Sequence, residues 1–393
     1  MGKKFLLVKS YQKLHKSIIM KLLIISQTEH YFKDGRIVGW GPTVNEVNHL
    51  LKIFNEIYHI GVIYKDKVAP QSSIHYISKK IKFIGLKPSG GKSFFEKIDI
   101  LFNAPQTLLK VHKILKKVDV FQFRSPVGIG TYLIPYLSIF NKKPGWFKYA
   151  GNWIEKKPPL GYKIQRNFLK NFQSRTVTIN GRWDDDYAHL LSFENPCLDT
   201  NDRLVGLNIL NKKSYNNPLT ICFAGRFGES KGEDKIIESL KNFPNQRMFK
   251  EVHFIGDGNN FPNLIKSSKK VNIPIKFHGF VNREKVFKIF MSSDFILLPS
   301  KNSEGFPKVI AEASNFGCIP IVSNVSSIPQ YIKNNYNGFL WDTEKENFFT
   351  FFNRFFLNID NDKLKEIARN SHNLVSSFTY EYYNKRIVDE IIK

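Results

Sequence analysis

The sequence is poor in cysteine and contains no long apolar run. Its 393 residues include three cysteines, an odd number without the spacing of metal ligands. That pattern predicts neither a disulfide framework nor a structural zinc site, and it indicates a reducing compartment. No stretch of about eighteen apolar residues is present, so we expect no transmembrane helix. Basic residues interrupt the amino-terminal apolar stretch too early for the core of a signal peptide.

Acidic residues are also scarce relative to basic ones. The chain has 59 Lys and Arg against 34 Asp and Glu, a net charge of +25. Residues 1–200 hold 32 of the basic and 14 of the acidic residues, so most of the excess lies in the first half. Such charge can serve solubility alone, or it can meet nucleic acid, a phospholipid surface or a diphosphate-linked substrate. No nucleic-acid reader motif accompanies it, so we expect no nucleic-acid partner.

Length and composition favour two folded domains. The chain is 42% apolar and 14% aromatic, well above the disordered range, and it is long enough for two cores. Short apolar runs alternate with helical patterns, which predicts an α/β fold. The first strand is expected at residues 21–26, so we interpret residues 1–19 as a basic extension. The polar segment 195–217 is interpreted as the interdomain loop.

The most informative stretch runs from residue 295 to residue 322. Residues 295–299 form a short apolar strand, and Pro307 suits the first turn of a helix that follows a polar loop. Open α/β sheets bind ligands at the carboxyl ends of their strands, where this loop would lie. We therefore expect free backbone amides near Gly305 and Phe306 to face an anion or a sugar hydroxyl.

Two glutamates lie within this stretch. Glu304 precedes the helix and Glu312 lies inside it, eight positions later. A glutamate in the loop can face a reacting sugar, and one about a turn and a half into the helix can reach a neighbouring ribose. A lone glutamate on a helix is more often a solvated residue, so the surrounding pattern has to decide between these interpretations.

A second glycine-rich loop follows the apolar strand 219–224. It contains Arg226 and Lys231 between two glycines, just before a helical pattern. A departing diphosphate accumulates negative charge, and two fixed cations at a strand end would stabilise it. The next strands end in the motifs G-D-G at 256–258 and H-G-F at 278–280. For His278 a hydrogen-bonded structural role is favoured over general-base catalysis.

Together these motifs closely resemble the retaining family 4 glycosyltransferases of the GT-B fold. The matching elements are the E-x7-E signature at 304–312 and the G-R-x4-K-G element at 225–232, and the resemblance is specific from about 219 to 340. It implies two doubly wound, Rossmann-like domains that face a central cleft. These are an acceptor-binding domain at 20–205 and a nucleotide-sugar-binding domain at 206–372. Residues 373–393 would form a helix that crosses back to the first domain. The family's Gly pair and Glu are replaced here by Val325-Ser326-Ser327 and Gln330.

The resemblance also implies the roles of individual residues. Glu304, Arg226 and Lys231 are the expected catalytic residues, and the donor is a UDP- or GDP-linked sugar. Because the two cations neutralise the diphosphate, neither a metal nor another cofactor is expected. The further donor-binding residues that the resemblance implies are Gly225, Gly256, His278, Gly279, Phe280, Gly305, Phe306, Pro307, Lys308 and Glu312.

The first half carries weaker signals for the acceptor side. A glycine-rich turn at 39–43 and two strand ends place Gly41, Arg124 and Asn152 at the expected cleft. The amphipathic basic helix 105–118 and the basic stretch 156–175 can pack with their lysines in solvent, or contact anionic lipid. The resemblance implies a glycan or polyprenyl-diphosphate-linked acceptor in cell-surface polysaccharide biosynthesis. The protein would then be cytoplasmic and peripheral on the inner face of the membrane.

Several alternatives stay open from the sequence alone. The aspartates at 184–186 could imitate a metal-binding motif, although acidic residues at the start of a helix are favoured there. The chain could instead be a basic protein that binds nucleic acid or another polyanion, or a non-catalytic sugar-nucleotide-binding protein. Intact Arg226, Lys231, Glu304 and Glu312 favour an enzyme over the last of these.

Overall fold

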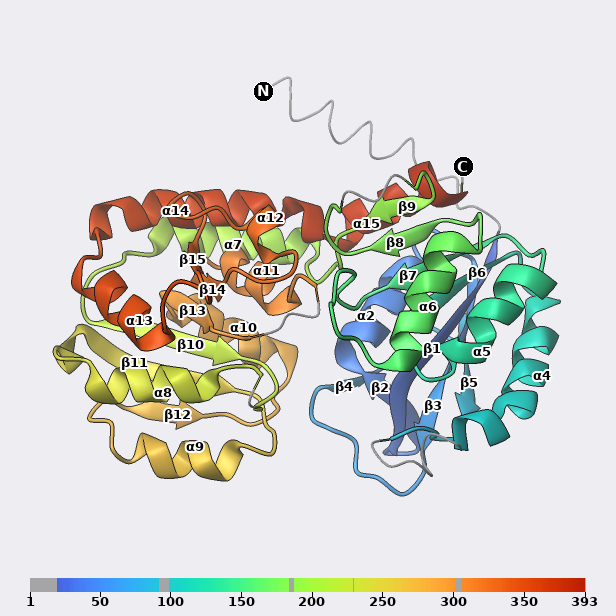
Figure 1. Ribbon diagram of the computed structural model, residues 1–393, viewed down its shortest axis with the longest axis horizontal. Helices are drawn as coiled ribbons and strands as arrows, with labels where there is room; N and C mark the ends of the chain where they lie inside the picture. The colour runs from blue at the N-terminus through green and yellow to red at the C-terminus, as the bar shows by residue number, and fades with distance from the viewer. Residues whose placement is uncertain (1–19, 92–98, 184–186, 229, 302–304, 393) are drawn as a thin grey trace.

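The protein has two lobes, each built on an open sheet with helices on its faces (Figure 1). This computed structural model describes residues 20–91, 99–183, 187–228, 230–301 and 305–392. The predicted α/β architecture of two Rossmann-like domains is confirmed. The amino-terminal extension, the aspartates at 184–186 and Glu304 lie outside the described residues.

The first domain is organised around β1 (Lys21–Lys33). Its parallel neighbours follow the order β5-β3-β1-β6-β7-β8-β9. These strands are β3 (Glu56–Tyr64), β5 (Ile81–Leu86), β6 (Val120–Ser125), β7 (Gly145–Tyr149), β8 (Val177–Ile179) and β9 (Leu190–Ser192).

Alternating apolar residues bury both faces of this sheet. Leu22 and Ile24 of β1 belong to one core, and Leu23 and Ile25 belong to the core on the opposite face. Successive side chains of a strand point to opposite faces, so a doubly covered parallel sheet reads as a continuous apolar run. The helices that cover it are α2 (Gly41–Leu50) and α15 (Tyr380–Arg386) on one face, and α4 (Ala104–Leu115), α5 (Gly130–Pro135), the π-helix η1 (Tyr136–Phe140) and α6 (Leu160–Asn171) on the other.

The predicted glycine-rich turn at 39–43 is wrong. Strand β1 continues past Ser26, and Gly39 and Trp40 end an antiparallel partner, β2 (Arg36–Trp40), which in turn pairs with β4 (Ser73–His75). The turn lies earlier, at Asp34 and Gly35, where φ is 50° and 71°. Two successive positive φ angles suit a tight hairpin, and they allow the chain to reverse there.

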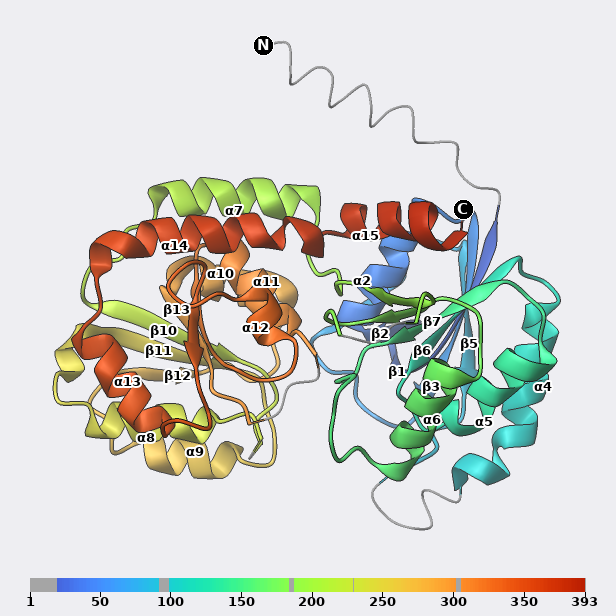
Figure 2. The same ribbon diagram turned by 45° about the horizontal axis from the view of Figure 1, so that its top comes forward.

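The second domain contains a parallel sheet of order β12-β11-β10-β13-β14-β15. Its strands are β10 (Leu219–Ala224), β11 (Phe249–Ile255), β12 (Ile275–Phe277), β13 (Phe295–Leu298), β14 (Ile319–Ser323) and β15 (Phe339–Trp341). One face carries α8 (Glu233–Asn242), α9 (Phe261–Ser268) and α13 (Phe348–Leu357), and the other carries α7 (Thr200–Lys212), α10 (Arg283–Ser292), α11 (Lys308–Asn315) and α14 (Asn361–Leu374) (Figure 2).

The segment predicted as an interdomain loop contains the helix α7. Asp199 caps this helix by accepting a hydrogen bond from the Asp202 amide at 2.8 Å, and Asp202 accepts one from the Asp199 amide at 2.9 Å. Such a capping box satisfies amides that the first helical turn leaves without partners. The helix packs on α11 and α14 of the second domain. Because it runs from Thr200 to Lys212, the predicted domain boundary at 205/206 falls inside it. After α14 the chain returns to the first domain through α15 (Figure 2).

None of the helices in the described ranges has the length and apolarity needed to cross a bilayer.

Replacing the cap of α7 tests its contribution. Asp199→Ala removes the side-chain acceptor of the capping box, so we expect the free energy of unfolding to fall by about 1 kcal/mol. Urea unfolding followed by circular dichroism measures this loss. Asp199→Asn keeps an acceptor at the same position and serves as the control. Equal stability of Asp199→Ala and the unaltered protein would contradict the assignment.

Candidate functional site

Loops after three neighbouring strands meet backbone to backbone at the carboxyl edge of the second sheet. The Gly225 amide donates to the Ile255 carbonyl at 2.9 Å, and the Gly256 amide donates to the Gly279 carbonyl at 2.9 Å. Gly256 has φ of 130°, and a β-carbon there would lie 1.9 Å from the Gly225 oxygen. Only glycine permits both this conformation and this approach, so three predicted donor-side glycines hold the edge together.

The loop with Arg226 and Lys231 packs on the loop after β13. Gly232 has φ of 78°, and a β-carbon there would lie 2.1 Å from the Pro299 oxygen. The Lys301 amide also donates to the Ser230 carbonyl at 2.9 Å. Arg226 is exposed and Lys231 is half-buried beside the start of α8. A helix N-terminus and two cations together make this edge suited to an anion.

His278 is held by a chain of side-chain contacts. Its Nε2 lies 2.9 Å from His253 Nδ1, and His253 Nε2 lies 3.1 Å from Glu251 Oε1. Burial lowers the pKa of both histidines, which favours their neutral forms. The side chain of Phe280, two residues later, is 40% exposed at the same edge.

The amide expected to be free at Phe306 is occupied, so that prediction is wrong. It donates to Asn180 Oδ1 of the first domain at 3.0 Å, because the loop after β8 reaches across to this segment. The Phe306 ring is buried against Tyr331 and Phe378. Gly305, at φ of 91°, leaves room for Asn180: a β-carbon on it would lie 3.1 Å from the Asn180 side chain.

Two of the positions that depart from the family pattern, Ser327 and Gln330, contact the first domain. Ser327 Oγ donates to Asn180 Oδ1 at 2.9 Å. Gln330, in α12 (Ile328–Tyr331), accepts from the Arg182 amide at 2.6 Å and donates to the Arg182 carbonyl at 2.7 Å. At these two positions, side chains that differ from the family pattern form hydrogen bonds between the domains.

The helix that carries the second glutamate begins at the domain interface. Pro307 caps α11 and Lys308 is its first residue. Glu312 lies one turn further on and is partly exposed. Burial raises the pKa of Glu312, while Arg283 and Lys308 act in the opposite direction. Arg283 is itself paired with Asp202 at 2.6 Å.

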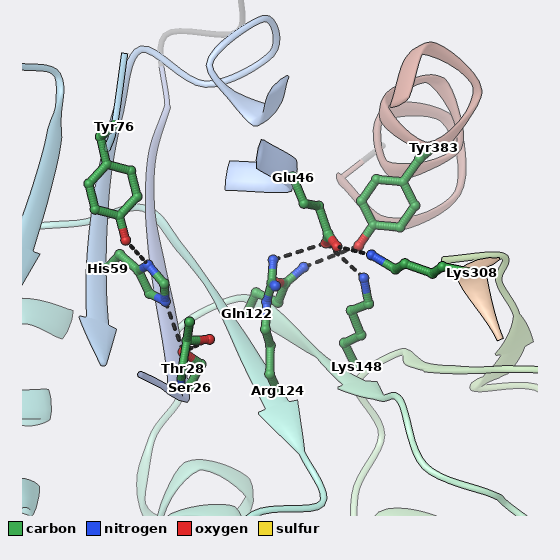
Figure 3. Close-up of polar contacts among 10 residues, drawn as sticks. All are labelled: Ser26, Thr28, Glu46, His59, Tyr76, Gln122, Arg124, Lys148, Lys308 and Tyr383. Carbon is green, nitrogen blue, oxygen red and sulfur yellow. Dashed lines mark hydrogen bonds and ion pairs between the residues drawn. The ribbon is translucent and has the colours of Figure 1, made fainter. Parts of the chain in front are cut away.

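A buried ionic cluster joins the two domains at Glu46 of α2 (Figure 3). Glu46 Oε1 accepts hydrogen bonds from Arg124 Nη2 at 2.9 Å and from Lys148 Nζ at 2.7 Å. Lys308 Nζ, from the second domain, lies 3.7 Å from Glu46 Oε2. The hydroxyl of Tyr383 on α15 points at the same carboxylate (Figure 3). We call these five residues the Glu46 cluster.

The Glu46 cluster has more positive than negative groups, because three cations surround one carboxylate. Burial alone would raise the pKa of Glu46, but the three cations hold it well below its usual value. Burial lowers the pKa of Lys148 to about 7, even though Glu46 acts to raise it. The carboxylate therefore stays ionised near neutral pH, while Lys148 is poised to lose its proton there.

The predicted acceptor-side residues do not gather at one point. Arg124 belongs to the Glu46 cluster, and its side chain is 12% exposed. Gly41 begins α2, where a β-carbon would lie 2.3 Å from the Ser72 carbonyl oxygen. Asn152 Oδ1 accepts from the Ile154 amide at 3.2 Å and so supports its own loop. Gly41 and Asn152 thus shape the backbone.

Sequence reasoning missed Glu46 and Asn180, which hold the two domains together. Glu46 is one polar residue in an ordinary helical pattern, and Asn180 is one polar residue after a strand. Neither belongs to a motif, so the sequence offers no signal that singles them out. Within the described ranges, no group of three or more His, Cys, Asp or Glu residues is arranged to hold a metal ion.

Lys148→Met should change how stability depends on pH. The ordinary pKa of lysine is 10.5, and that of Lys148 is about 7 in the folded protein. Between these values the unfolded chain holds a proton that the folded chain has released. This group therefore makes the free energy of unfolding rise with pH, and the variant lacks that contribution.

Urea unfolding of both proteins at about pH 7 and about pH 9 measures the effect. The unaltered protein should gain stability relative to the variant on going to the higher pH. Glu46 keeps two cationic partners in Lys148→Met, so the variant retains a paired carboxylate. Parallel pH profiles would contradict the lowered pKa.

Comparison with known proteins gives a family for the second domain. Residues 208–373 match the family described as glycosyl transferases group 1. A Klebsiella pneumoniae protein described as an uncharacterized 41.2 kDa protein in the cps region is 27% identical over 151 residues, which cover 38% of this chain and 40% of that protein. The chain thus matches less than half the length of that relative.

Two further similarities extend over most of the chain. The amylovoran biosynthesis glycosyltransferase AmsK of Erwinia amylovora is 28% identical over 352 residues, covering 76% of this chain and 82% of that protein. The Anabaena protein Alr3699/HepE, solved with UDP and glucose, superposes with a TM-score of 0.67 at 15% identity, covering 95% of this chain and 100% of that one. Residues 208–373 thus form a glycosyl transferases group 1 domain, a glycosyltransferase domain (EC 2.4), and the whole chain has the two-domain GT-B fold.

Proposed function

We propose that the chain transfers a sugar from a nucleotide-sugar donor to a glycan or polyprenyl-diphosphate-linked acceptor, with retention of the anomeric configuration. The observation that carries the proposal is the set of loops packed together at the carboxyl edge of the second sheet. Arg226 and Lys231 lie in the loop that connects β10 to the N-terminus of α8. Two cations beside a helix N-terminus suit the diphosphate of a nucleotide-sugar.

The proposed reaction exchanges one bond for another at the sugar C1. The bond from C1 to the β-phosphate oxygen breaks, and a bond from C1 to the acceptor hydroxyl oxygen forms on the same face. The acceptor proton passes to the leaving phosphate oxygen, so no protein base is needed. Arg226 and Lys231 stabilise the charge on the departing nucleoside diphosphate, and the proposal therefore includes no metal ion. Glu304 orients the sugar hydroxyls, and Glu312 binds the ribose.

The donor carries uridine or guanosine in this proposal. The Anabaena protein was solved with UDP and glucose, which supports a uridine nucleotide first. The exposed ring of Phe280, beside Gly279 at the same edge, is a suitable surface for a nucleobase.

A screen of UDP- and GDP-linked sugars tests the donor. One of them should raise the melting temperature, and Lys231→Ala should weaken its binding because a lost charged hydrogen bond costs about 1.5–3 kcal/mol. Lys269→Ala, on the exposed surface after α9, is the matched control and should bind normally. Turnover of the donor should persist in EDTA. Activity that vanishes on chelation and returns with Mg²⁺ or Mn²⁺ would contradict metal independence.

The same screen separates the competing functions. A protein that binds a nucleotide-sugar but neither hydrolyses nor transfers it would be a non-catalytic binding protein. A protein that binds none of the nucleotide-sugars, but is stabilised by nucleic acid or another polyanion, would be a polyanion-binding protein whose binding comes from its basic charge.

We propose that the reaction belongs to cell-surface polysaccharide biosynthesis. The names of two relatives support this, one in amylovoran biosynthesis and one in a cps region. A polymer of this kind can be built on a soluble glycan or on a lipid-linked saccharide. The surface of the first domain favours the lipid-linked one.

One face of the first domain combines exposed apolar side chains with lysines. It is formed by α4, α6 and, between them, α5 with its continuation η1 (Figure 1). Its exposed apolar residues are Leu109, Ile139, Phe140, Leu160, Ile164 and Phe172. Lysine-lined hollows of about 180 and 440 Å³ lie on the same face. Apolar side chains among cations fit an anionic bilayer surface, where each lysine contributes about 1 kcal/mol.

We therefore propose that the protein is cytoplasmic and bound peripherally to the inner face of the membrane. Sedimentation with vesicles of phosphatidylserine and phosphatidylcholine should show binding that weakens as salt rises, because screening acts over about 8–10 Å. A variant with Lys116, Lys142 and Lys143 changed to Glu should bind less. Lys269 and Lys270 changed to Glu, in the second domain, form the control. Equal, negligible binding to anionic and neutral vesicles at low salt would contradict the membrane proposal.

A further inference from the structure

The start of α11 is held by the first domain at two neighbouring points. Asn180 Oδ1 accepts from the Phe306 amide at 3.0 Å, and Glu46 Oε2 lies 3.7 Å from Lys308 Nζ. These contacts bracket Pro307, in the segment that connects the donor loop to its helix. The position of this segment is therefore set by the first domain as well as by the sheet that it belongs to.

The Glu46 contact is built into the interior of the protein. Glu46 is 2% exposed, and its carboxylate is held in place by Arg124 and Lys148, which come from β6 and β7. A buried charge must have partners to offset its loss of hydration. Three cations from both domains meet this need, and only Lys308 among them belongs to the domain with the candidate donor site.

Other contacts of α2 and of the residues just after it reach α15 without touching α11. Asn45 Nδ2 donates to the Tyr380 hydroxyl at 3.0 Å, and Lys52 Nζ pairs with Glu381 at 2.9 Å. Both partners lie on α15. These contacts dock the carboxy-terminal helix, so they provide a comparison for a contact that also reaches the donor segment.

We propose that Glu46 is a positioning residue for sugar transfer, which acts by fixing Lys308 and the start of α11 against the first-domain sheet. The inference rests on the proposed function. Its consequence is that the acceptor-binding domain sets where the donor sugar lies relative to the acceptor hydroxyl. A small displacement of reacting groups lowers the rate of a reaction much more than it lowers binding.

Lys308→Met is the cleanest test of this role. It removes the bridging cation and leaves Glu46 paired with Arg124 and Lys148, so no buried carboxylate loses all its partners. With the nucleotide-sugar that the unaltered protein turns over, kcat should fall by about tenfold or more. The dissociation constant of UDP, or of GDP for a GDP-linked donor, should stay within about twofold. Lys308→Arg keeps the cation and should restore most of the rate.

Glu46→Gln completes a double-mutant cycle. It should lower kcat in the same way. Adding it to Lys308→Met should lower kcat little further, because both changes remove the same Lys308–Glu46 ion pair. Lys52→Met is the control, since it breaks another Lys–Glu ion pair, between a residue just after α2 and one on α15, that does not touch α11. It should leave kcat within about twofold of the unaltered protein.

The outcomes separate the inference from the proposed function. An unaltered protein that turns over no nucleotide-sugar contradicts the proposed function, and the positioning role with it. Turnover by the unaltered protein together with normal kcat in Lys308→Met contradicts the positioning role alone. Weakened nucleotide binding in Lys308→Met would mean that Lys308 contacts the donor directly, and independent, additive losses in the double variant would show that the two residues do not act together.

Discussion

Backbone atoms of neighbouring loops touch at the carboxyl edge of the second sheet, and the candidate donor site depends on this contact. A β-carbon at Gly256 or Gly232 would approach a carbonyl oxygen to 1.9 or 2.1 Å. Such a collision is with backbone, which has no rotamer that could relieve it. The loops would have to separate, and Arg226, Lys231 and the start of α8 would move with them. The arrangement of charge at this edge thus depends on glycine, which has no β-carbon, at positions 232 and 256.

The second domain could be predicted in detail because its signals are local. A strand, a loop and a helix follow each other within about thirty residues, and each glycine or proline marks a boundary. The same local reasoning failed at α7. Leu204 and Leu207 of this helix are exposed, so its apolar pattern is weak, and the capping pair Asp199 and Asp202 reads as part of a polar loop. Packing on α11 and α14 stabilises this helix, which a single sequence does not reveal.

The contacts between the domains could not be predicted, for a different physical reason. Glu46 meets Arg124 and Lys148, which are 78 and 102 residues away along the chain. A carboxylate is almost never buried without partners, so its burial and its cations have to arise together. Each residue alone reads as a solvated charge. The sequence also shows that Ser327 and Gln330 depart from the family pattern. It does not show that their side chains form hydrogen bonds to the first domain.

The packing of the carboxy-terminal helix on the first domain has a consequence for folding during translation. Tyr383 and Ile387 lie in the same buried cluster as Leu22 and Ile24 of β1. A ribosome releases a chain from its amino terminus, and domains generally fold as they emerge. Here one face of the first sheet keeps an uncovered apolar surface until residue 387 has left the ribosome. The second domain has all its strands and its core before that moment. The first domain to be made is therefore the last to be completed.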